Sequence, residues 1–460
     1  MSSTNETHGH NGECVHCRLD LDFSMPNKIL DAAKSEDLAI FAGAGISTEV
    51  QSVFPETIYE TVANLVETSE NNSFPELMQK FQEKFSRSDL IKLIKKKFDY
   101  VDSFPNSRNA ARMFHRELAT MPYISNIITT NWDTYFEEEC AAVPFVTGED
   151  VALYGIPGRK VIKIHGSISN LGSIVATEDD YKKRLDALSR NTMGGILRAI
   201  LSTKTVVFIG YSMRDWNFLQ LYNALVEDMG DYAPEAYIVS PFSSAEIIDS
   251  KLRLRAIETS GVKFLSVLKE QMSQECLYSD DGIYDMIDSM KYDLLEADDL
   301  AKTIPHKDYP SVISSWMYHD GALDACFRIE YLRKSGEYSD RHALEHKMIS
   351  YQRLGEFAES EGRYLDQAYI EGYLNVLLLI SSDKDEREEA CKTMPRYFIP
   401  EVDDELMNRG DLVKALEGAP KAIPDAHAFF KKISDELPAE LVMEHNRMIH
   451  GAPPGFTARQ

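Results

Sequence analysis

Four short apolar runs, each ending in small or polar residues, constrain the fold of this chain most. The residues that follow these runs are Gly43-Ala44-Gly45, Asn131-Trp132-Asp133, His165-Gly166-Ser167 and Gly210-Tyr211-Ser212. Short apolar runs bounded by turn residues are typical of buried strands. Ligands of open α/β sheets bind at the carboxyl ends of the strands. The pattern therefore predicts a ligand site in the loops at one edge of a sheet.

The runs predict an α/β fold, a Rossmann-like doubly wound parallel sheet of about six strands with helices on both faces. We expect strands at 37–41, 124–129, 161–164, 205–209, 236–239 and 262–265. Residues 27–35 and 178–202 read as helices. Residues 56–120 have a helical pattern and predict a module inserted between two strands. Pro105 interrupts this module, so at least two helices are needed.

Two of these motifs have chemical interpretations of their own. A glycine-rich turn after a strand lets the backbone approach a phosphate closely, and the N–H groups of the next turn can point at the anion. A lone histidine at a strand end, such as His165, is more often a structural residue than a catalytic one. Its position among three other strand-end motifs favours a role in the site.

With 460 residues, the chain is too long for one ordinary core. We expect a polar leader at 1–25, an α/β domain at 26–270, an acidic linker at 271–304, a helical domain at 305–450 and a disordered tail at 451–460. Gly-Glu-aromatic corners at Gly336 and Gly355 suggest stacked helical hairpins in the helical domain. The cysteine pair Cys14 and Cys17 lies near three histidines and could bind zinc, or it is a chance cluster in a disordered tail.

The net charge of −25 lies mostly after residue 270 and opposes direct binding of nucleic acid. The basic run at 92–97 is interpreted as a solvated helix face. Six irregularly spaced cysteines do not indicate a disulfide framework. No apolar run is long enough to cross a membrane, and the first 25 residues lack the apolar region of a secretory signal. We therefore expect a cytoplasmic protein.

In this order, G-A-G-I-S, T-T-N-x-D, K-I-H-G-S and I-G-Y-S resemble the motifs of the sirtuin-like (Sir-two) family of NAD-consuming proteins. The resemblance covers about residues 30–270 and implies NAD as the substrate. It implies catalytic roles for Asn131, which would orient water and the ribose hydroxyls, and for His165 as general base. Asp133 would hold the nicotinamide carboxamide. The phosphates would be cradled by Gly43, Ala44, Gly45 and Ser47, aided by Gly210 and Ser212.

For the adenosine half of NAD, the resemblance offers Asp215 and Ser240, with purely structural roles as a helix cap and a strand end equally open. The chain departs from the deacetylating sirtuins in two places. No cysteine lies between His165 and Thr205, so their zinc ribbon is missing. The run 48–55 also lacks the Phe-Arg pair that covers the nicotinamide end in those enzymes. Acyl-lysine chemistry is therefore less expected than NAD binding.

The leading hypothesis is an NAD+ glycohydrolase of the antiphage-defence branch of the family, which depletes NAD+ during infection (abortive infection) and needs no metal for catalysis. The alternatives are an NAD-dependent protein deacylase and a non-catalytic NAD- or ADP-ribose-binding module, with nuclease activity ranked last. Expected partners are further copies of the chain in a homo-oligomer, and a HerA-type ATPase or a phage protein as trigger. Six aromatic positions would either form the assembly surface or fill the helical core: Trp316, Tyr331, Tyr351, Tyr364, Tyr369 and Tyr373.

Overall fold

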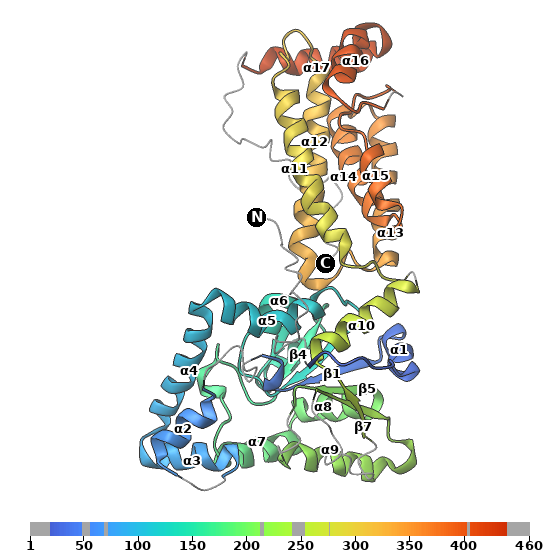
Figure 1. Cartoon of the computed structure of the whole chain (residues 1–460). Helices are drawn as coiled ribbons and strands as arrows, with labels where there is room; N and C mark the ends of the chain where they lie inside the picture. Colours follow the sequence, from blue (N-terminus) through green and yellow to red (C-terminus); the bar gives the residue numbers. More distant parts are fainter. Residues whose placement is uncertain are drawn as a thin grey trace. The chain divides into compact units, whose positions relative to one another are not determined.

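The computed structural model describes residues 19–47, 56–68, 72–211, 216–241, 254–275, 277–402 and 405–438, except for the side chains of 216–221. The chain divides into two compact units. Residues 1–275 and 334–336 form an α/β unit, and residues 276–333 and 337–460 form a helical unit. Figure 1 draws the α/β unit in blue to yellow-green and the helical unit in yellow to red.

The α/β unit is built on a seven-stranded parallel sheet with the order β3-β4-β2-β1-β5-β6-β7. The strands are β1 (Leu38–Ala42), β2 (Asn126–Thr129), β3 (Val143–Phe145), β4 (Lys160–Lys163), β5 (Thr205–Ile209), β6 (Ala236–Ser240) and β7 (Leu254–Glu258). The chain first builds one side of β1 and then crosses to β5 on the other side. The order of strands therefore reverses between β1 and β5, where ligands of such sheets bind.

The central strands form because their residues are apolar and enclosed on both faces. All five residues of β1 are buried, which is the pattern of a parallel sheet covered by helices. In Figure 1, α5 (Pro105–Ala119), α6 (Tyr135–Cys140) and α10 (Gly261–Gln274) lie on one side of the sheet, with α8 (Thr192–Thr203) and α9 (Trp216–Met229) on the other. Helices α1 (Asn27–Lys34) and α7 (Glu178–Arg190) complete this layer arrangement.

The inserted module between β1 and β2 consists of α2 (Ile58–Val66), α3 (Phe74–Lys84), α4 (Arg87–Ser103) and α5. Each of the first three begins at a Ser or Thr cap, and the caps of α2 and α3 are capping boxes with Glu60 and Glu76. Pro105 is the first residue of α5, where its missing N–H has no intrahelical partner to lose. The predicted break at Pro105 is thus confirmed.

Three predictions for the α/β unit differ from the structure. The sheet has seven strands, and residues 262–265 belong to α10, whose buried Phe264, Leu265, Leu268 and Met272 follow a helical period. The last strand is instead β7, an edge strand with only two buried residues. The helix expected at 178–202 is two helices, because the Asn191 side chain caps α8 through Gly194 N at 2.8 Å.

The expected polar leader also differs, because residues 19–25 already pack against the α/β unit. The carbonyl oxygen of Leu21 accepts from Thr259 Oγ1 at 2.8 Å, and Phe23 stacks on Phe264 with ring centroids 6.0 Å apart. Residues 1–18, and with them Cys14 and Cys17, lie outside the described residues. The hypothesis of a zinc site there stays a prediction.

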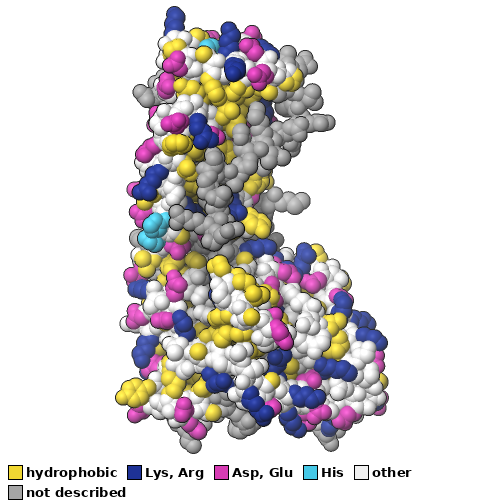
Figure 2. All heavy atoms as spheres, turned by 180° about the vertical axis from the view of Figure 1, so that it is seen from behind, with side chains coloured by type: hydrophobic (Ala, Val, Ile, Leu, Met, Phe, Trp, Pro, Cys, Tyr) yellow, Lys and Arg dark blue, Asp and Glu magenta, His cyan; other side chains and the backbone are white. Residues whose placement is uncertain are grey.

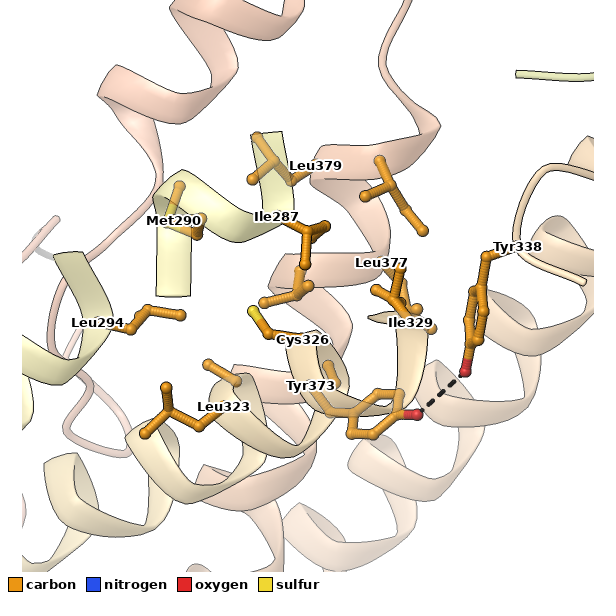
Figure 3. Packing of buried hydrophobic residues seen from close by; sticks show 14 of the residues in the cluster. Ile287, Met290, Leu294, Leu323, Cys326, Ile329, Tyr338, Tyr373, Leu377 and Leu379 are labelled. Carbon is orange, nitrogen blue, oxygen red and sulfur yellow. Dashed lines mark hydrogen bonds between the residues drawn. The ribbon is translucent and has the colours of Figure 1, made fainter. Parts of the chain in front are cut away.

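The helical unit contains α11 (Gly282–Lys302), α12 (Val312–Leu332), α13 (Arg341–Ser360), α14 (Tyr364–Ser381), α15 (Arg387–Thr393), α16 (Arg409–Ala422) and α17 (Pro424–Glu436). Helices α12 and α14 approach most closely, at glycines. A Cβ on Gly321 would lie 1.9 Å from the Tyr369 carbonyl oxygen, and one on Gly372 would lie 2.0 Å from the Tyr318 carbonyl oxygen. Figure 3 shows the core beside this contact, with Tyr338 and Tyr373 joined by their hydroxyls at 3.2 Å.

The helical unit differs from the sequence prediction in two places. Residues 282–302, expected in an acidic linker, form α11, which buries Ile287, Met290 and Leu294 on one face. Gly355 lies inside α13 rather than at a corner, so the repeat suggested by Gly336 and Gly355 does not exist. Among the helices that the structure describes, none is long and apolar enough to cross a membrane.

Candidate functional site

The four predicted motifs follow neighbouring strands at the same level of the sheet. Ala42 pairs with Thr129 and with Ile209, and Thr129 pairs with Lys163. In this register, Asn131 and His165 each lie two residues beyond paired strand ends, while Gly43 and Gly210 lie one residue beyond. The parallel register therefore brings these motifs together at one edge of the sheet, as predicted.

A buried cluster of Ser47, Asn131 and Asp133 lies at this edge. The Ser47 hydroxyl donates to Asp133 Oδ2 at 3.1 Å, and Asn131 Nδ2 donates to Ser47 Oγ at 3.3 Å and to the Gly43 carbonyl oxygen at 3.2 Å. Ser47, Asn131 and Asp133 are at most 5% exposed. This cluster joins the loops that follow β1 and β2.

The amide of Asn131 has a defined orientation. A backbone carbonyl can only accept a hydrogen bond, so the nitrogen of the amide must face Gly43. The backbone N–H of Asn131 donates to Thr129 Oγ1 at 3.0 Å, which holds the residue in place. Asn131 Oδ1 is buried and has no hydrogen-bond partner among the described residues. The cluster thus presents a buried, unpaired acceptor at the position where the sequence predicts a catalytic residue.

A buried lysine binds the backbone of the turn that carries Asp133. Lys163 is fully buried, donates to the Asp133 carbonyl oxygen and pairs with Glu137 Oε1 at 3.0 Å. The N–H of Tyr135 donates to Asp133 Oδ1 at 3.2 Å. Burial raises the pKa of the Glu137 carboxyl, and the neighbouring Lys163 ammonium opposes this rise. Both oxygens of Asp133 and its backbone therefore have partners.

The glycines of the first and last motifs bring two loops into direct backbone contact. Gly43 N donates to the Ile209 carbonyl oxygen at 3.0 Å, and Gly45 N donates to the Gly210 carbonyl oxygen at 2.8 Å. A Cβ on Gly43 would lie 2.6 Å from that Gly210 oxygen, and Gly210 has a φ of +59°. Side chains at these positions would force the loops apart. The glycines are thus explained by close packing at the point where the strand order reverses.

The expected phosphate cradle is only partly available in this geometry. The N–H groups of Gly43 and Gly45 bond to the β5 side, and those of Ile46 and Ser47 donate to the carbonyl oxygens of Gly43 and Ala44 at 3.2 and 3.0 Å. Four of the five N–H groups in the turn are therefore occupied. Phosphate binding by the backbone of this turn rests on Ala44, so the assignment of all these residues stays a prediction.

His165 lies in a tightly bonded loop after β4. Its carbonyl oxygen accepts from Val175 N at 2.9 Å, and the residue as a whole is 8% exposed. Gly166 has a φ of +86°, and a Cβ there would lie 2.1 Å from the Ser173 carbonyl oxygen. The His165 Nδ1 atom lies 3.5 Å from the hydroxyl of Tyr181 on α7. The loop thus fixes the backbone of His165 and leaves its ring against α7.

The comparisons with known proteins agree with this arrangement. A family model described as a SIR2-like domain matches residues 125–265, which include Asn131, Asp133, His165 and Gly210. The α/β unit contains a SIR2-like domain. Two relatives are NAD(+) hydrolases named ThsA, from Enterococcus faecium (30% identical over 42% of this chain and 42% of its own length) and from Bacillus cereus (26%, over 40% and 38%). A third is Defense-associated sirtuin 2 from Bacillus subtilis, 20% identical over 81% of this chain and 35% of its own length.

The chain thus spans less than half the length of the curated relatives that it matches. The resemblance to the sirtuin-like family and the Rossmann-like doubly wound sheet are confirmed. The segment that would carry a zinc ribbon in deacetylating sirtuins holds α7 and α8 in this SIR2-like domain. Over the described residues, no group of three or more His, Cys, Asp or Glu side chains could hold a metal ion.

One predicted site residue lies away from the cluster, and two others cannot be placed. Ser240 ends β6, two strands from β1 and hence about 10 Å away at the usual strand spacing. Its carbonyl oxygen accepts from Thr259 N at 3.1 Å, so a structural role is present, and a role toward adenosine stays a prediction. Ser212 and Asp215 lie outside the described residues.

Three residues that support the SIR2-like site were not predicted from the sequence: Thr129, Lys163 and Glu137. Thr129 Oγ1 donates to the Ala42 carbonyl oxygen at 2.9 Å and accepts from Asn131 N, so it links β1 to the Asn131 turn. The role of Lys163 could have been predicted from the sequence, because a charge inside a buried strand requires a partner. The role of Glu137 could not, because it is one of three consecutive glutamates.

Proposed function

We propose that the SIR2-like domain hydrolyses NAD+ to nicotinamide and ADP-ribose. The observation that carries the proposal is Asn131, whose amide is locked by Gly43 and Ser47 and whose buried oxygen accepts from none of the described residues. An unpaired buried acceptor is unfavourable unless a ligand supplies a donor. A ribose hydroxyl or a water molecule is such a donor. Two relatives that are named NAD(+) hydrolases support the same reaction.

The chemistry asks for positioning more than for acid catalysis. Cleavage of the bond between nicotinamide and ribose develops positive charge on the ribose, and nicotinamide leaves as a neutral molecule. In the proposal, Asn131 Oδ1 orients the water or ribose hydroxyl and His165 accepts the proton that the water loses. Asp133 would hold the nicotinamide carboxamide while it keeps the bond from Ser47. No step of this scheme uses a metal ion.

The test follows nicotinamide release from NAD+ by the purified protein, with and without an acetylated peptide. Asn131→Ala should lower the rate at least 10²-fold, because it removes an oriented group that acts in the transition state. Asn106→Ala, an exposed asparagine on α5, is the matched control and should behave as the wild type. If product forms only with the peptide, as O-acetyl-ADP-ribose, the deacylase alternative is correct.

We also propose that the reaction serves antiphage defence by depleting cellular NAD+. The name of the Bacillus subtilis relative, Defense-associated sirtuin 2, supports this role. Bacteria that carry the wild-type gene should lose NAD+ after phage infection, and bacteria that carry Asn131→Ala should not. Loss of NAD+ in both strains would show that another enzyme consumes it.

For partners, we propose a homo-oligomer that is triggered by a phage protein or a HerA-type ATPase. Of the six aromatic positions weighed for assembly, Trp316, Tyr351 and Tyr373 are buried in the helical core. Support comes instead from Tyr331, which is 74% exposed, and from Tyr292 on α11, which is 58% exposed. Figure 2 shows hydrophobic side chains reaching the surface of the helical unit on the face that it draws. Light scattering that gives only a 52.2 kDa species, with or without NAD+, would exclude self-association.

A further inference from the structure

The ring of His165 packs against Tyr181, a residue to which the sequence motifs assign no role. The two ring centroids lie 4.7 Å apart, and Nδ1 of His165 faces the Tyr181 hydroxyl oxygen at 3.5 Å. This distance is at the long end of the hydrogen-bonding range. Bonds of this kind in active sites are often long before substrate binds and shorten in the complex. Tyr181 is therefore in position to interact with one specific nitrogen of the imidazole.

Which nitrogen carries the proton decides what His165 can do. In a neutral imidazole, one nitrogen is a donor and the other an acceptor, and the bond made by one determines the state of the other. If Nδ1–H donates to the Tyr181 oxygen, Nε2 keeps its lone pair and can accept a proton from water. If Nε2 carries the proton instead, it cannot act as a base. A hydroxyl is suited to this task because it can accept a hydrogen bond while it remains uncharged.

Helix α7 holds Tyr181 rigidly enough for such a task. Asp180, the preceding residue, accepts from Ala176 N and Thr177 N, both at 3.1 Å, and closes the capping box of α7. Arg87, at the start of α4, donates to Asp180 Oδ2 at 2.6 Å. Burial alone would raise the pKa of Asp180, but these hydrogen bonds and the Arg87 guanidinium charge keep it below its usual range. The first turn of α7 is thus fastened to the inserted helical module.

Helix α7 also contacts the backbone of the loop that carries His165. Arg184, one turn after Tyr181, donates to the Ser173 carbonyl oxygen at 3.5 Å, the oxygen against which Gly166 packs. Side chains three apart on a helix share a face. Tyr181 and Arg184 therefore approach the loop together, one at the ring of His165 and one at its backbone.

We propose that Tyr181 is a positioning residue, whose hydroxyl oxygen accepts from Nδ1–H of His165 and keeps Nε2 unprotonated as the base. The proposal rests on the proposed NAD+ hydrolysis for its catalytic meaning, whereas the proton position itself is a property of the protein alone. Tyr181 touches His165 and acts through it. A charged side chain that contacts the same loop is Arg184, through the Ser173 carbonyl oxygen.

The first test reads the proton position directly by nitrogen NMR of the full-length protein labelled in histidine, with His165→Gln to assign the signal. The wild type should show the Nδ1–H form. Tyr181→Phe keeps the ring packing and removes the acceptor, so it should shift His165 toward the Nε2–H form. Tyr232→Phe, at a tyrosine that is 92% exposed, is the control and should change nothing. A wild-type signal of the Nε2–H form, or an unchanged signal in Tyr181→Phe, would overturn the proposal.

The second test uses kinetics. Tyr181→Phe should lower kcat about tenfold and move the acidic limb of the pH profile of kcat/KM to lower pH, because the imidazolium loses an acceptor. KM for NAD+ should stay within about twofold, whereas a purely structural role would raise KM as well. A wild type that releases no nicotinamide but shows the Nδ1–H form would contradict the proposed function and leave the proton assignment standing.

Discussion

Replacing Lys163 by Met tests how the site is supported. The lysine side chain is fully buried, and its ammonium group lies 3.0 Å from Glu137 Oε1 and bonds to the Asp133 carbonyl oxygen. Methionine preserves most of the aliphatic volume and removes the charge. The side chain of Glu137 is only 17% exposed, and its carboxyl then remains without its cation. Removing one partner of a buried ion pair typically costs about 3–5 kcal/mol of stability.

The stability that Lys163→Met loses should depend on pH. Without Lys163, the folded protein can keep Glu137 neutral, which raises the folded pKa above the unfolded value of about 4.3. Stability then falls as pH rises above that value, since the unfolded state releases a proton that the folded state keeps. Keeping Glu137 protonated in the folded state lowers the unfolding free energy by at most about 4 kcal/mol at pH 7 and about 1 kcal/mol at pH 5, because each pH unit above about 4.3 contributes 1.36 kcal/mol. The Lys163→Met defect should therefore be largest at neutral pH.

Hydrogen exchange followed by mass spectrometry can measure this loss locally, in peptides that cover β2 and β4. The double variant Lys163→Met, Glu137→Gln removes the stranded carboxyl and should recover most of the stability that the single variant loses at pH 7. A single variant that loses less than about 1 kcal/mol, or equal amounts at pH 5 and pH 7, would refute the reasoning about the buried pair.

Three further substitutions test other parts of the fold. Gly43→Ala should lower the free energy of unfolding by about 1–3 kcal/mol in urea titrations, because its Cβ would lie 2.6 Å from the Gly210 oxygen. Gly195→Ala, in open space on α8, is the control and should leave the stability unchanged. Burial lowers the pKa of His115 to about 4. The wild type should therefore lose about 3 kcal/mol of unfolding free energy as the pH falls from 6.5 to 4. His115→Phe should remove most of this pH dependence in urea titrations. Gly372→Ala should lower the Tm of the helical unit by circular dichroism, because the new Cβ would lie 2.0 Å from a carbonyl oxygen of α12; an unchanged Tm would mean that α12 and α14 can separate freely.

The central strands and the site motifs were predictable because burial leaves a direct trace in the sequence. Strand β1 is apolar throughout, and the motifs after β1, β2, β4 and β5 begin where the apolar runs end. Asn131 and His165 could be placed at one edge because parallel strands present their carboxyl ends on the same side. Register then brings the two residues to the same level.

Elements whose residues are half exposed were harder to predict. Strand β7 alternates buried residues with Arg255 and Glu258, so it lacks an apolar run. The apolar residues at 262–265 resemble a strand when taken alone. Together with Leu268 and Met272, they follow the period of a helix. Helix α11 was hidden by its acidic surface, although apolar residues recur along it every three or four positions.

Partners within the site were the least predictable feature, because they depend on packing between distant segments. Glu137 on α6 lies 26 residues from Lys163 on β4, and the two side chains meet only in the folded chain. Tyr181 stands in the charged run of α7, where nothing in the sequence distinguishes it from a surface residue. The use of backbone N–H groups in the Gly43 turn likewise follows from contact with β5, which the motif alone does not reveal.

We propose that this chain uses water to cleave NAD+ at the nicotinamide–ribose bond, with Asn131 in the site. Reaction in ¹⁸O-labelled water tests it most directly, with the products analysed by mass spectrometry for the wild type and for Asn131→Ala. We expect nicotinamide and ADP-ribose in equal amounts, one ¹⁸O atom in each ADP-ribose, and at least 10²-fold less of both from Asn131→Ala. Equal product from the two proteins would show that Asn131 has no part in the cleavage. The absence of labelled ADP-ribose both with purified wild type and in extracts of phage-infected cells that carry it would contradict the proposed hydrolysis.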